Sequence, residues 1–163
     1  MKIQIRQYRP ADIEGIKLIV KSLHPDWFDK DALLNIPLDV RFQKTFVAVS
    51  GKRLVGFITI RTKGGGAELE WIGVHSSMHG KGIGERLFKR LEGELRKAGV
   101  EYVTVETVGE CTPEYEPYAK TRAFYRAMGF RLYKRGKLKE GQGYKHRMYI
   151  YKKLLQPTKK KPL

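Results

Sequence analysis

The residues best suited to chemistry lie in a glycine-rich stretch, residues 79–84 (His-Gly-Lys-Gly-Ile-Gly), which follows an apolar segment that ends at Val74. An amphipathic helix is predicted to begin at Ile83, so this stretch leads into the N-terminus of a helix. The first turn of a helix presents unpaired N–H groups and a partial positive charge, and glycines let a ligand approach the backbone closely. With the added charge of Lys81, these features predict a site for a phosphate or diphosphate group.

Two common phosphate-binding motifs do not match this stretch. A Walker A loop has Ser or Thr directly after its lysine, whereas Lys81 is followed by Gly82. A dinucleotide-binding fingerprint has its last glycine at the position that Glu85 occupies here. A glycine turn that binds no ligand is therefore the alternative interpretation.

Tyr125 is the candidate general acid. Its phenol, with a pKa near ~10 in water, is protonated at neutral pH and can donate to a leaving group. On a helical wheel of the predicted helix 118–128, Phe124 and Met128 form the apolar stripe, and Tyr125 falls at a boundary that faces a cleft. A core aromatic residue without a chemical role is the alternative.

Three glutamates are candidate general bases. Glu68 and Glu70 alternate along the predicted strand 67–74, which places both side chains on one face of the sheet. Glu106 lies near the end of the next predicted strand. For each of them a solvated strand face is the competing interpretation, and a reaction without a side-chain base is a further one.

The pattern of apolar residues predicts a single α/β domain with a mixed sheet, covering residues 1–155. One helix buries Ile16, Ile19 and Leu23 on one face, and a second, over 83–98, buries Leu87 and Leu91. Predicted strands cover residues 2–8, 45–50, 54–61, 67–74, 100–107, 130–134 and 147–151, and predicted helices cover a segment after Pro10 and residues 29–36, 83–98 and 118–128.

Positive charge is concentrated at the C-terminal end. The whole sequence has 33 basic and 17 acidic residues, a net charge of +16, whereas residues 131–163 alone carry 12 basic residues and one acid, Glu140. Such a basic end favours an acidic or nucleic-acid partner. Residues 156–163 have little apolar surface to bury, and we expect them to form a disordered tail.

Several other features limit the kinds of site and the cellular location that the sequence allows. The single cysteine, Cys111, excludes an internal disulfide and favours a reducing cytoplasm. Cys111 lies in a predicted loop without a histidine nearby in sequence, so a catalytic thiol is a minor alternative. His75 and His79 would suit a metal only on a helix, and we expect no metal. No apolar run is long enough to cross a membrane and no signal peptide is visible, so we expect a cytoplasmic protein without a membrane partner.

Two stretches resemble the signatures of the GNAT N-acetyltransferase family. Residues 79–84, between a strand and an amphipathic helix, are similar to its acetyl-CoA-binding motif (Arg/Gln)-x-x-Gly-x-(Gly/Ala), with His79 where Arg or Gln is usual. Residues 121–130 are similar to its second signature, a helix that carries Phe/Leu-Tyr and ends in Gly-Phe. The resemblance covers about residues 1–152, and Tyr118 stands where the family often has Asn.

The resemblance implies the GNAT fold, with a mixed, mostly antiparallel sheet of roughly six or seven strands flanked by about four helices. It implies acetyl-CoA as a cosubstrate and no metal. The contacts to the cofactor then fall on Val74, His79, Gly80, Lys81, Gly82, Ile83, Gly84 and Glu85.

It also implies direct transfer from a thioester to a primary amine in a ternary complex. Such transfer needs a polarised carbonyl group, a neutral amine and a proton for the leaving thiolate. Backbone N–H groups near Val74, at a local splay of the sheet, would polarise the carbonyl. Tyr125 would act as the acid, and Glu70 or Glu68 would act as the base through water, with Glu106 as a third candidate.

The resemblance also bears on the acceptor. His24, Asp26, Trp27 and Phe28 follow the first helix, in a region that borders the acceptor cleft of GNAT domains. They are expected to shape acceptor binding, and packing of the two aromatic residues is the alternative.

These observations predict an acetyl-CoA-dependent N-acetyltransferase that acts on a primary amine of a small molecule or protein. The alternative is a non-catalytic basic module that binds RNA or ribosomes on a GNAT scaffold. A homodimer is compatible with either.

Overall fold

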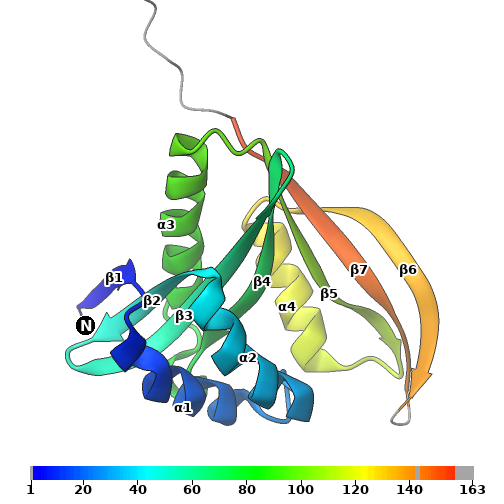
Figure 1. The fold of residues 1–163 in the computed structure, drawn as a ribbon. Helices are drawn as coiled ribbons and strands as arrows, with labels where there is room; N and C mark the ends of the chain where they lie inside the picture. The colour runs from blue at the N-terminus through cyan, green and yellow to red at the C-terminus, as the bar shows by residue number, and fades with distance from the viewer. Residues whose placement is uncertain (1, 142–143, 157–163) are drawn as a thin grey trace, which may run out of the picture.

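The computed structural model describes residues 2–141 and 144–156. Within them, seven strands form one sheet on which four α-helices pack (Figure 1). In chain order the elements are β1 (Ile3–Gln7), a 3₁₀ turn η1 (Pro10–Asp12), α1 (Ile13–Leu23), α2 (Lys30–Phe42), β2 (Lys44–Ser50), β3 (Arg53–Lys63), β4 (Gly66–Val74), a 3₁₀ turn η2 (Ser76–Met78), α3 (Ile83–Lys97), β5 (Tyr102–Thr112), α4 (Glu116–Ala127), β6 (Arg131–Gly141) and β7 (Tyr144–Leu154).

The sheet order is β1-β2-β3-β4-β5-β7-β6. Neighbouring strands are antiparallel except β4 and β5, which run parallel because α3 crosses over between them. The predicted fold class, a mixed and mostly antiparallel α/β sheet with four helices, is confirmed.

Two apolar cores hold the helices on opposite faces of the sheet. The predicted inward face of α1 is buried and packs with α2 in one core, beside Phe57 of β3. The inward face of α3 and Tyr125 of α4 lie in the other core. The molecule is therefore a three-layer sandwich, with α1 and α2 on one face of the sheet and α3 and α4 on the other (Figure 1).

Lys153 of β7 links the two helices on that face. Its Nζ donates to the carbonyl of Met128, at the end of α4, over 2.8 Å, and it forms an ion pair with Glu92 of α3. Arg96, one turn further along α3, also pairs with Glu92. The cluster fixes the end of α4 beside α3.

Helix α2 extends past the predicted end at residue 36 to Phe42 and includes Pro37. A proline inside a helix removes one backbone hydrogen bond, which is the reason to expect a stop. The helix continues because Ala32, Ile36 and Val40 form one buried stripe that runs through the proline.

Strands β5, β6 and β7 are longer than predicted. β5 continues to Thr112, so Cys111 lies in a strand and is buried, and the prediction of a loop there is wrong. β6 and β7 form an 11-residue-long antiparallel pair whose strands carry many exposed charges. Strand β7 forms backbone hydrogen bonds with β5 on one side and β6 on the other, and these bonds stabilise the long strands. The pattern of apolar residues does not predict such pairing.

The predicted tail, residues 156–163, falls outside the described residues apart from Gln156, and the division into one domain and a tail stays a prediction. Among the described helices, none is both long and apolar enough to span a bilayer.

Gly73 and Gly93 provide a matched test of the packing. A Cβ on Gly73 would lie 2.8 Å from Cε1 of the fully buried Phe57, so Gly73→Ala overpacks the core. We expect it to lower the free energy of unfolding in urea by about 1–3 kcal/mol. A Cβ on Gly93, inside α3, meets nothing within 4 Å, so Gly93→Ala should raise that free energy by about 0.5–1 kcal/mol. Equal changes in the two variants would contradict the packing described here.

Candidate active site

The sheet splays open between β4 and β5. These strands pair only from Gly66 with Tyr102 to Leu69 with Val105, and the rest of each strand diverges from the other (Figure 1). The edge of β4 over residues 70–74 therefore lacks β5 as a hydrogen-bonding partner. Backbone groups at such an edge are available to a ligand or to water.

A β-bulge at Glu70 coincides with the start of the splay. Thr59 of β3 lies opposite Trp71, but its neighbour Ile60 lies opposite Leu69, so Glu70 has no partner on β3. Leu69 packs in the core beside α3, whereas Trp71, two residues later, packs in the core beside α1 and α2. The bulge thus interrupts the strict alternation that the sequence analysis assumed for this strand.

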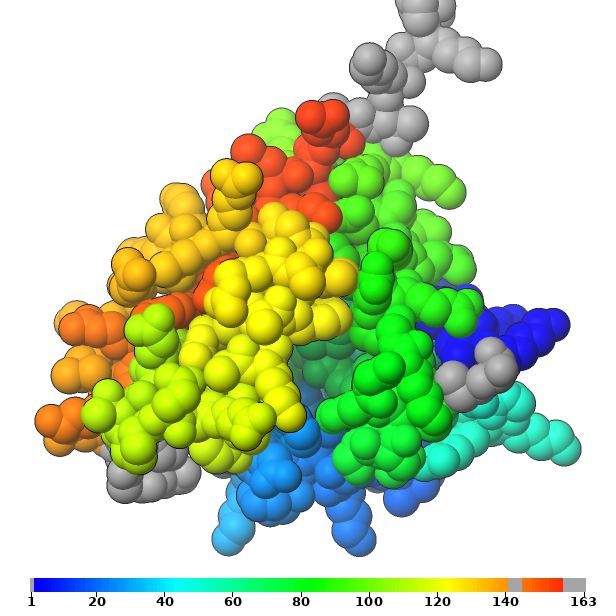
Figure 2. All heavy atoms as spheres, turned by 180° about the vertical axis from the view of Figure 1, so that it is seen from behind, coloured from blue at the N-terminus to red at the C-terminus, as the bar shows by residue number. Residues whose placement is uncertain are grey.

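A cavity of about 720 Å³ occupies the splay. Its walls come from the α1–α2 connection, β4, residues 78–85, β5 and α4. Figure 2 shows its opening as a hollow between the yellow α4 and the green segment that leads into α3. Of the predicted site residues, it brings together Glu70, Val74, His79, Gly80, Gly82, Ile83, Gly84, Glu85, Glu106 and Tyr125, whereas Glu68 and Lys81 are not among its lining residues.

The glycine stretch has the backbone geometry of an open cradle. Gly80 and Gly82 have φ angles of 77° and 75°, in the left-handed region, and a Cβ on either would meet nothing within 4 Å. The first α3 backbone bond runs from the Arg86 N–H to the Gly82 carbonyl, at 3.1 Å. The N–H groups of the preceding residues are left for other acceptors. The Lys81 side chain is exposed nearby.

His79 anchors this loop to the splayed strand. Its Nε2–H donates to the carbonyl of Val74 over 2.7 Å, and its ring makes an edge contact with Trp27, with centroids 5.1 Å apart. His75 is directed elsewhere, because its Nδ1 accepts a hydrogen bond from the Ser77 N–H. Both histidines therefore make hydrogen bonds that stabilise the conformation of the loop.

The α1–α2 connection forms a strap across one end of the cavity. The Trp27 indole donates to the carbonyl of Pro117 at the start of α4 over 3.2 Å, and the Tyr115 hydroxyl donates to the carbonyl of Asp26 over 2.8 Å. Phe28 lines the cavity beside Trp27, and His24 bonds within the connection, to the carbonyl of Phe28. These residues border the region expected for the acceptor.

Tyr125 lies deeper than the helical wheel indicated. Its ring is buried among Phe124, Phe130 and Tyr151, and Phe124 and Met128, expected to be the buried stripe, are only half-buried. Tyr125 still lines the cavity. Burial raises the pKa of Tyr125 well above its usual value, so the hydroxyl keeps its proton at neutral pH.

Glu70 is the glutamate of β4 that reaches the cavity. Arg61 of β3 pairs with both Glu70 (2.7 Å) and Glu68 (3.1 Å), which holds the two carboxylates beside each other. The Oε1 atom of Glu70 is buried and accepts no well-aligned hydrogen bond from the described residues. Burial, and then the charge of Glu68, raise the pKa of Glu70 above its ordinary value, and Arg61 offsets only part of this.

Acidic groups surround this end of the cavity. Glu106 of β5 lines it opposite β4, and the charges of Glu106 and Asp39 also contribute to the raised pKa of Glu70. Asp39 accepts a hydrogen bond from the Trp71 indole over 2.9 Å. Sequence reasoning did not select Trp71, Asp39 or Arg61, because their proximity depends on cross-strand register and on the extension of α2.

Cys111 is remote from this chemistry. It is buried at the end of β5, and desolvation raises the pKa of its thiol. A raised pKa keeps sulfur in the weakly nucleophilic thiol form, so it lacks the activation that a catalytic cysteine needs.

Comparison with protein families identifies the class. A family model described as an acetyltransferase (GNAT) domain matches residues 41–132, which is more than half of the chain and includes both the glycine loop and α4. The chain belongs to the GNAT acetyltransferase family, as the two sequence signatures predicted. No curated protein matches the sequence closely.

Solved structures share the fold across almost the whole chain. A GNAT-family protein from Desulfovibrio desulfuricans is 20% identical with a TM-score of 0.82, and the match covers 95% of this chain and 100% of that one. PaiA N-acetyltransferase from Thermoplasma acidophilum, solved with coenzyme A, is 17% identical with a TM-score of 0.71 and coverages of 94% and 99%. An aminoglycoside 6′-N-acetyltransferase, also complexed with coenzyme A, is 19% identical with a TM-score of 0.76 and coverages of 96% and 99%.

Proposed function

We propose that this protein is an acetyl-CoA-dependent N-acetyltransferase that passes the acetyl group directly to a primary amine of a small molecule or protein. The observation that carries the proposal is a single cavity in which the glycine loop, the free edge of β4, Tyr125 and Glu70 meet. The two structural neighbours solved with coenzyme A support the choice of cosubstrate. Nothing in the comparisons favours a non-catalytic RNA-binding module.

The residues present fit coenzyme A. Its diphosphate is matched by the free N–H groups at the start of α3, and Gly80 and Gly82 leave open the space that side chains would fill. The amides of its pantetheine arm are matched by the unpaired backbone edge of β4 next to Val74. Bound acetyl-CoA would supply the acetyl group as a thioester.

Tyr125 would donate a hydrogen bond to the sulfur as it leaves. Because burial raises the pKa of its hydroxyl, Tyr125 is a weaker acid than the phenol assumed from sequence. It therefore serves as a fixed donor, and stabilisation of the developing negative charge by such a donor is greatest where water is excluded.

Glu70 would receive, through a water molecule, the proton that the amine loses. Its raised pKa makes this carboxylate a stronger base than an exposed glutamate, and the charge of Arg61 limits that rise. Glu68 pairs with the same arginine outside the cavity lining, so we assign it the supporting role. Glu106 faces the cavity and stays the second candidate base.

Negative charge around Glu70 also favours the acceptor. An amine approaches largely as a cation at neutral pH, and the carboxylates of Glu68, Glu70 and Glu106 provide a negative potential that attracts it. Trp27, Phe28 and Trp71 supply apolar walls for the rest of the acceptor.

Gly82→Ala tests cofactor binding. A Cβ here would enter the cradle, so acetyl-CoA affinity, measured by calorimetry, should fall at least about tenfold. Gly64→Ala is the matched control, because Gly64 also has a positive φ (61°) and open space but lies in the β3–β4 turn. Equal losses of affinity, or no binding of acetyl-CoA to the unaltered protein, would refute the assignment.

Tyr125→Phe removes the donor and keeps the ring. We expect kcat to fall by about 10²–10³-fold, as for loss of one transition-state donor, with acetyl-CoA affinity nearly unchanged. Tyr151→Phe, which alters a neighbouring buried tyrosine outside this cavity, should leave kcat nearly unchanged. A large loss of cofactor affinity in Tyr125→Phe would instead assign Tyr125 a structural role. Release of free thiol with a panel of amines provides the assay.

Glu70→Gln should lower kcat by about 10²–10⁴-fold if Glu70 is the base, and Glu106→Gln should have a small effect. The reverse ranking of the Glu70 and Glu106 variants would transfer the role to Glu106.

Arg61→Gln removes the charge that lowers the pKa of Glu70. That pKa should therefore rise, and the acid limb of the pH profile of kcat/KM should move to higher pH. An unmoved acid limb in Arg61→Gln would contradict a base held by this arginine.

A further inference from the structure

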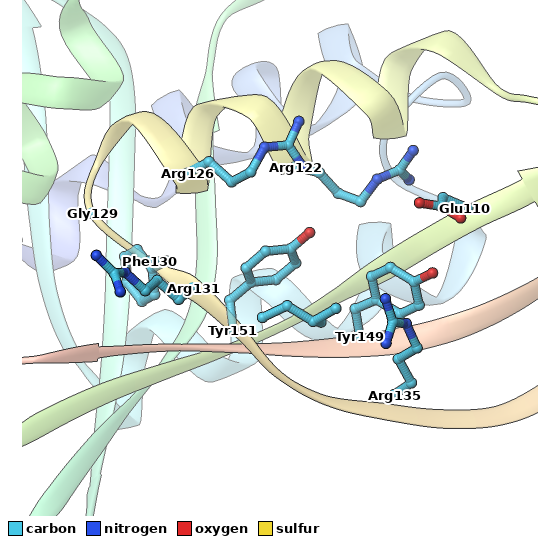
Figure 3. A pocket seen from close by; sticks show the side chains of 10 residues that line it. Glu110, Arg122, Arg126, Gly129, Phe130, Arg131, Arg135, Tyr149 and Tyr151 are labelled. Carbon is cyan, nitrogen blue, oxygen red and sulfur yellow. The ribbon is translucent and has the colours of Figure 1, made fainter.

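A second cavity, of about 550 Å³, lies on the other side of α4 from the candidate active site. It is bordered by α4, the end of β5 and the β6–β7 pair (Figure 3), and it shares no lining residue with the first cavity. Four arginines line it, namely Arg122, Arg126, Arg131 and Arg135, against a single acid, Glu110. The acetyl-transfer chemistry uses none of them.

Arg122 forms the fixed part of this cavity. It is buried, and its guanidinium donates to the carbonyls of Val108 (3.1 Å) and Gly109 (2.6 Å) and pairs with Glu114 (2.7 Å). Its donors are therefore largely used within the protein. It ties α4 to β5, two of the elements that line the cavity.

The other three arginines are available to a ligand. Arg126, Arg131 and Arg135 are exposed, and none forms an ion pair within the described residues. Arg135 lies over the ring of Tyr149, 5.5 Å from its centroid, which orients its guanidinium beside the cavity. Figure 3 shows the rings of Tyr149 and Tyr151 rising from β7 toward α4, so phenol groups and guanidinium groups border one space.

This chemistry selects phosphate among the common anions. A guanidinium presents paired donors that match phosphate or carboxylate oxygens. Three guanidinium groups without an ion pair, however, carry more positive charge than the single negative charge of one carboxylate can neutralise. A phosphate monoester carries about −1.5 to −2 at neutral pH, and adjacent phosphates carry more. The density of positive charge therefore favours an oligophosphate or a run of phosphodiesters.

The strands beside the cavity extend the same charge. Arg147 lies on the face of β7 that carries Tyr149 and Tyr151, because side chains two apart share a face. Lys134 and Lys139 lie on the opposite face, because their register partners are Ile150 and His146. On the cavity face Lys145 is paired with Glu140, the one acid within residues 131–141 and 144–156, so exposed Arg147 is the residue that extends the charge along β7. A row of arginines that continues from a cavity along a strand fits a polymer of phosphates better than a single phosphate.

We propose that this cavity and the adjoining β6–β7 strands bind the phosphate backbone of a single-stranded nucleic acid. The site adds a partner to the protein and does not depend on the acetyl-transfer assignment, since the two cavities are lined by different residues.

Fluorescence anisotropy with a labelled twelve-nucleotide oligouridylate tests the proposal on the full chain. Saturating coenzyme A is included in one series and omitted from a parallel one, so that phosphate binding at the first cavity is separated from binding at the second. The triple variant Arg126→Gln, Arg131→Gln, Arg135→Gln should lose at least about tenfold in affinity and lower the salt slope by about 2.

Arg41→Gln combined with Lys52→Gln is the control, because both side chains are exposed and lie on α2 and in the β2–β3 turn. It should leave affinity within about twofold. All variants keep Lys159, Lys160 and Lys161, so binding through that basic end contributes equally to each. Equal affinity in the triple variant and the control would overturn the proposal.

Two competing probes identify the ligand. If inorganic pyrophosphate binds as tightly as the oligonucleotide, the nucleic-acid assignment is wrong and the site belongs to a small phosphate compound. If an oligoglutamate peptide competes as well as oligouridylate, and does so through the same three arginines, preference for phosphate is refuted. Preferential binding of oligouridylate, lost in the triple variant, supports the proposal.

Discussion

The end of pairing between β4 and β5 is the constraint on which the candidate site depends. The two strands are hydrogen-bonded only as far as Leu69 and Val105, and the bulge at Glu70 marks the point where they part. Backbone groups left without a strand partner must find other partners, and here the Val74 carbonyl receives the His79 side chain while the remaining edge borders a cavity. Helix α4 packs against β5, and its Tyr125 lines the same cavity as the glycine loop.

Helix α4 is the wall between two chemically different spaces. Tyr125 and Phe124 border the first cavity, and Arg122 and Arg126 border the second. Charge follows the same division, because carboxylates of β4 and β5 surround the proposed acceptor end whereas the β6–β7 pair is strongly basic. In this protein of net charge +16, the carboxylates around Glu70 are thus separated by α4 from the arginines that line the second cavity.

Much of the fold followed from local patterns. The buried faces of α1 and α3 were predicted because apolar residues recur at helical spacing, and glycine with a positive φ at Gly99 and Gly129 marks the ends of α3 and α4. Helix α2 and the last strands were predicted too short, since a buried stripe overrides Pro37 and since pairing with β5 supports strands that show little apolar alternation. The glycine loop was predicted correctly as the link between a strand and a helix, because its residues are contiguous.

The sequence by itself determined the family and supplied the glycine loop and the candidate acids and bases as predictions, because the two family signatures are runs of contiguous residues. Tertiary structure decided which candidates meet. The bulge lies at Glu70, which lines the cavity whereas Glu68 does not. Burial among Phe124, Phe130 and Tyr151 raises the pKa of Tyr125, and register brings Arg61 within reach of both carboxylates. The physical reason is that desolvation and Coulomb interactions depend on distance in space, which only the packed sheet and helices fix.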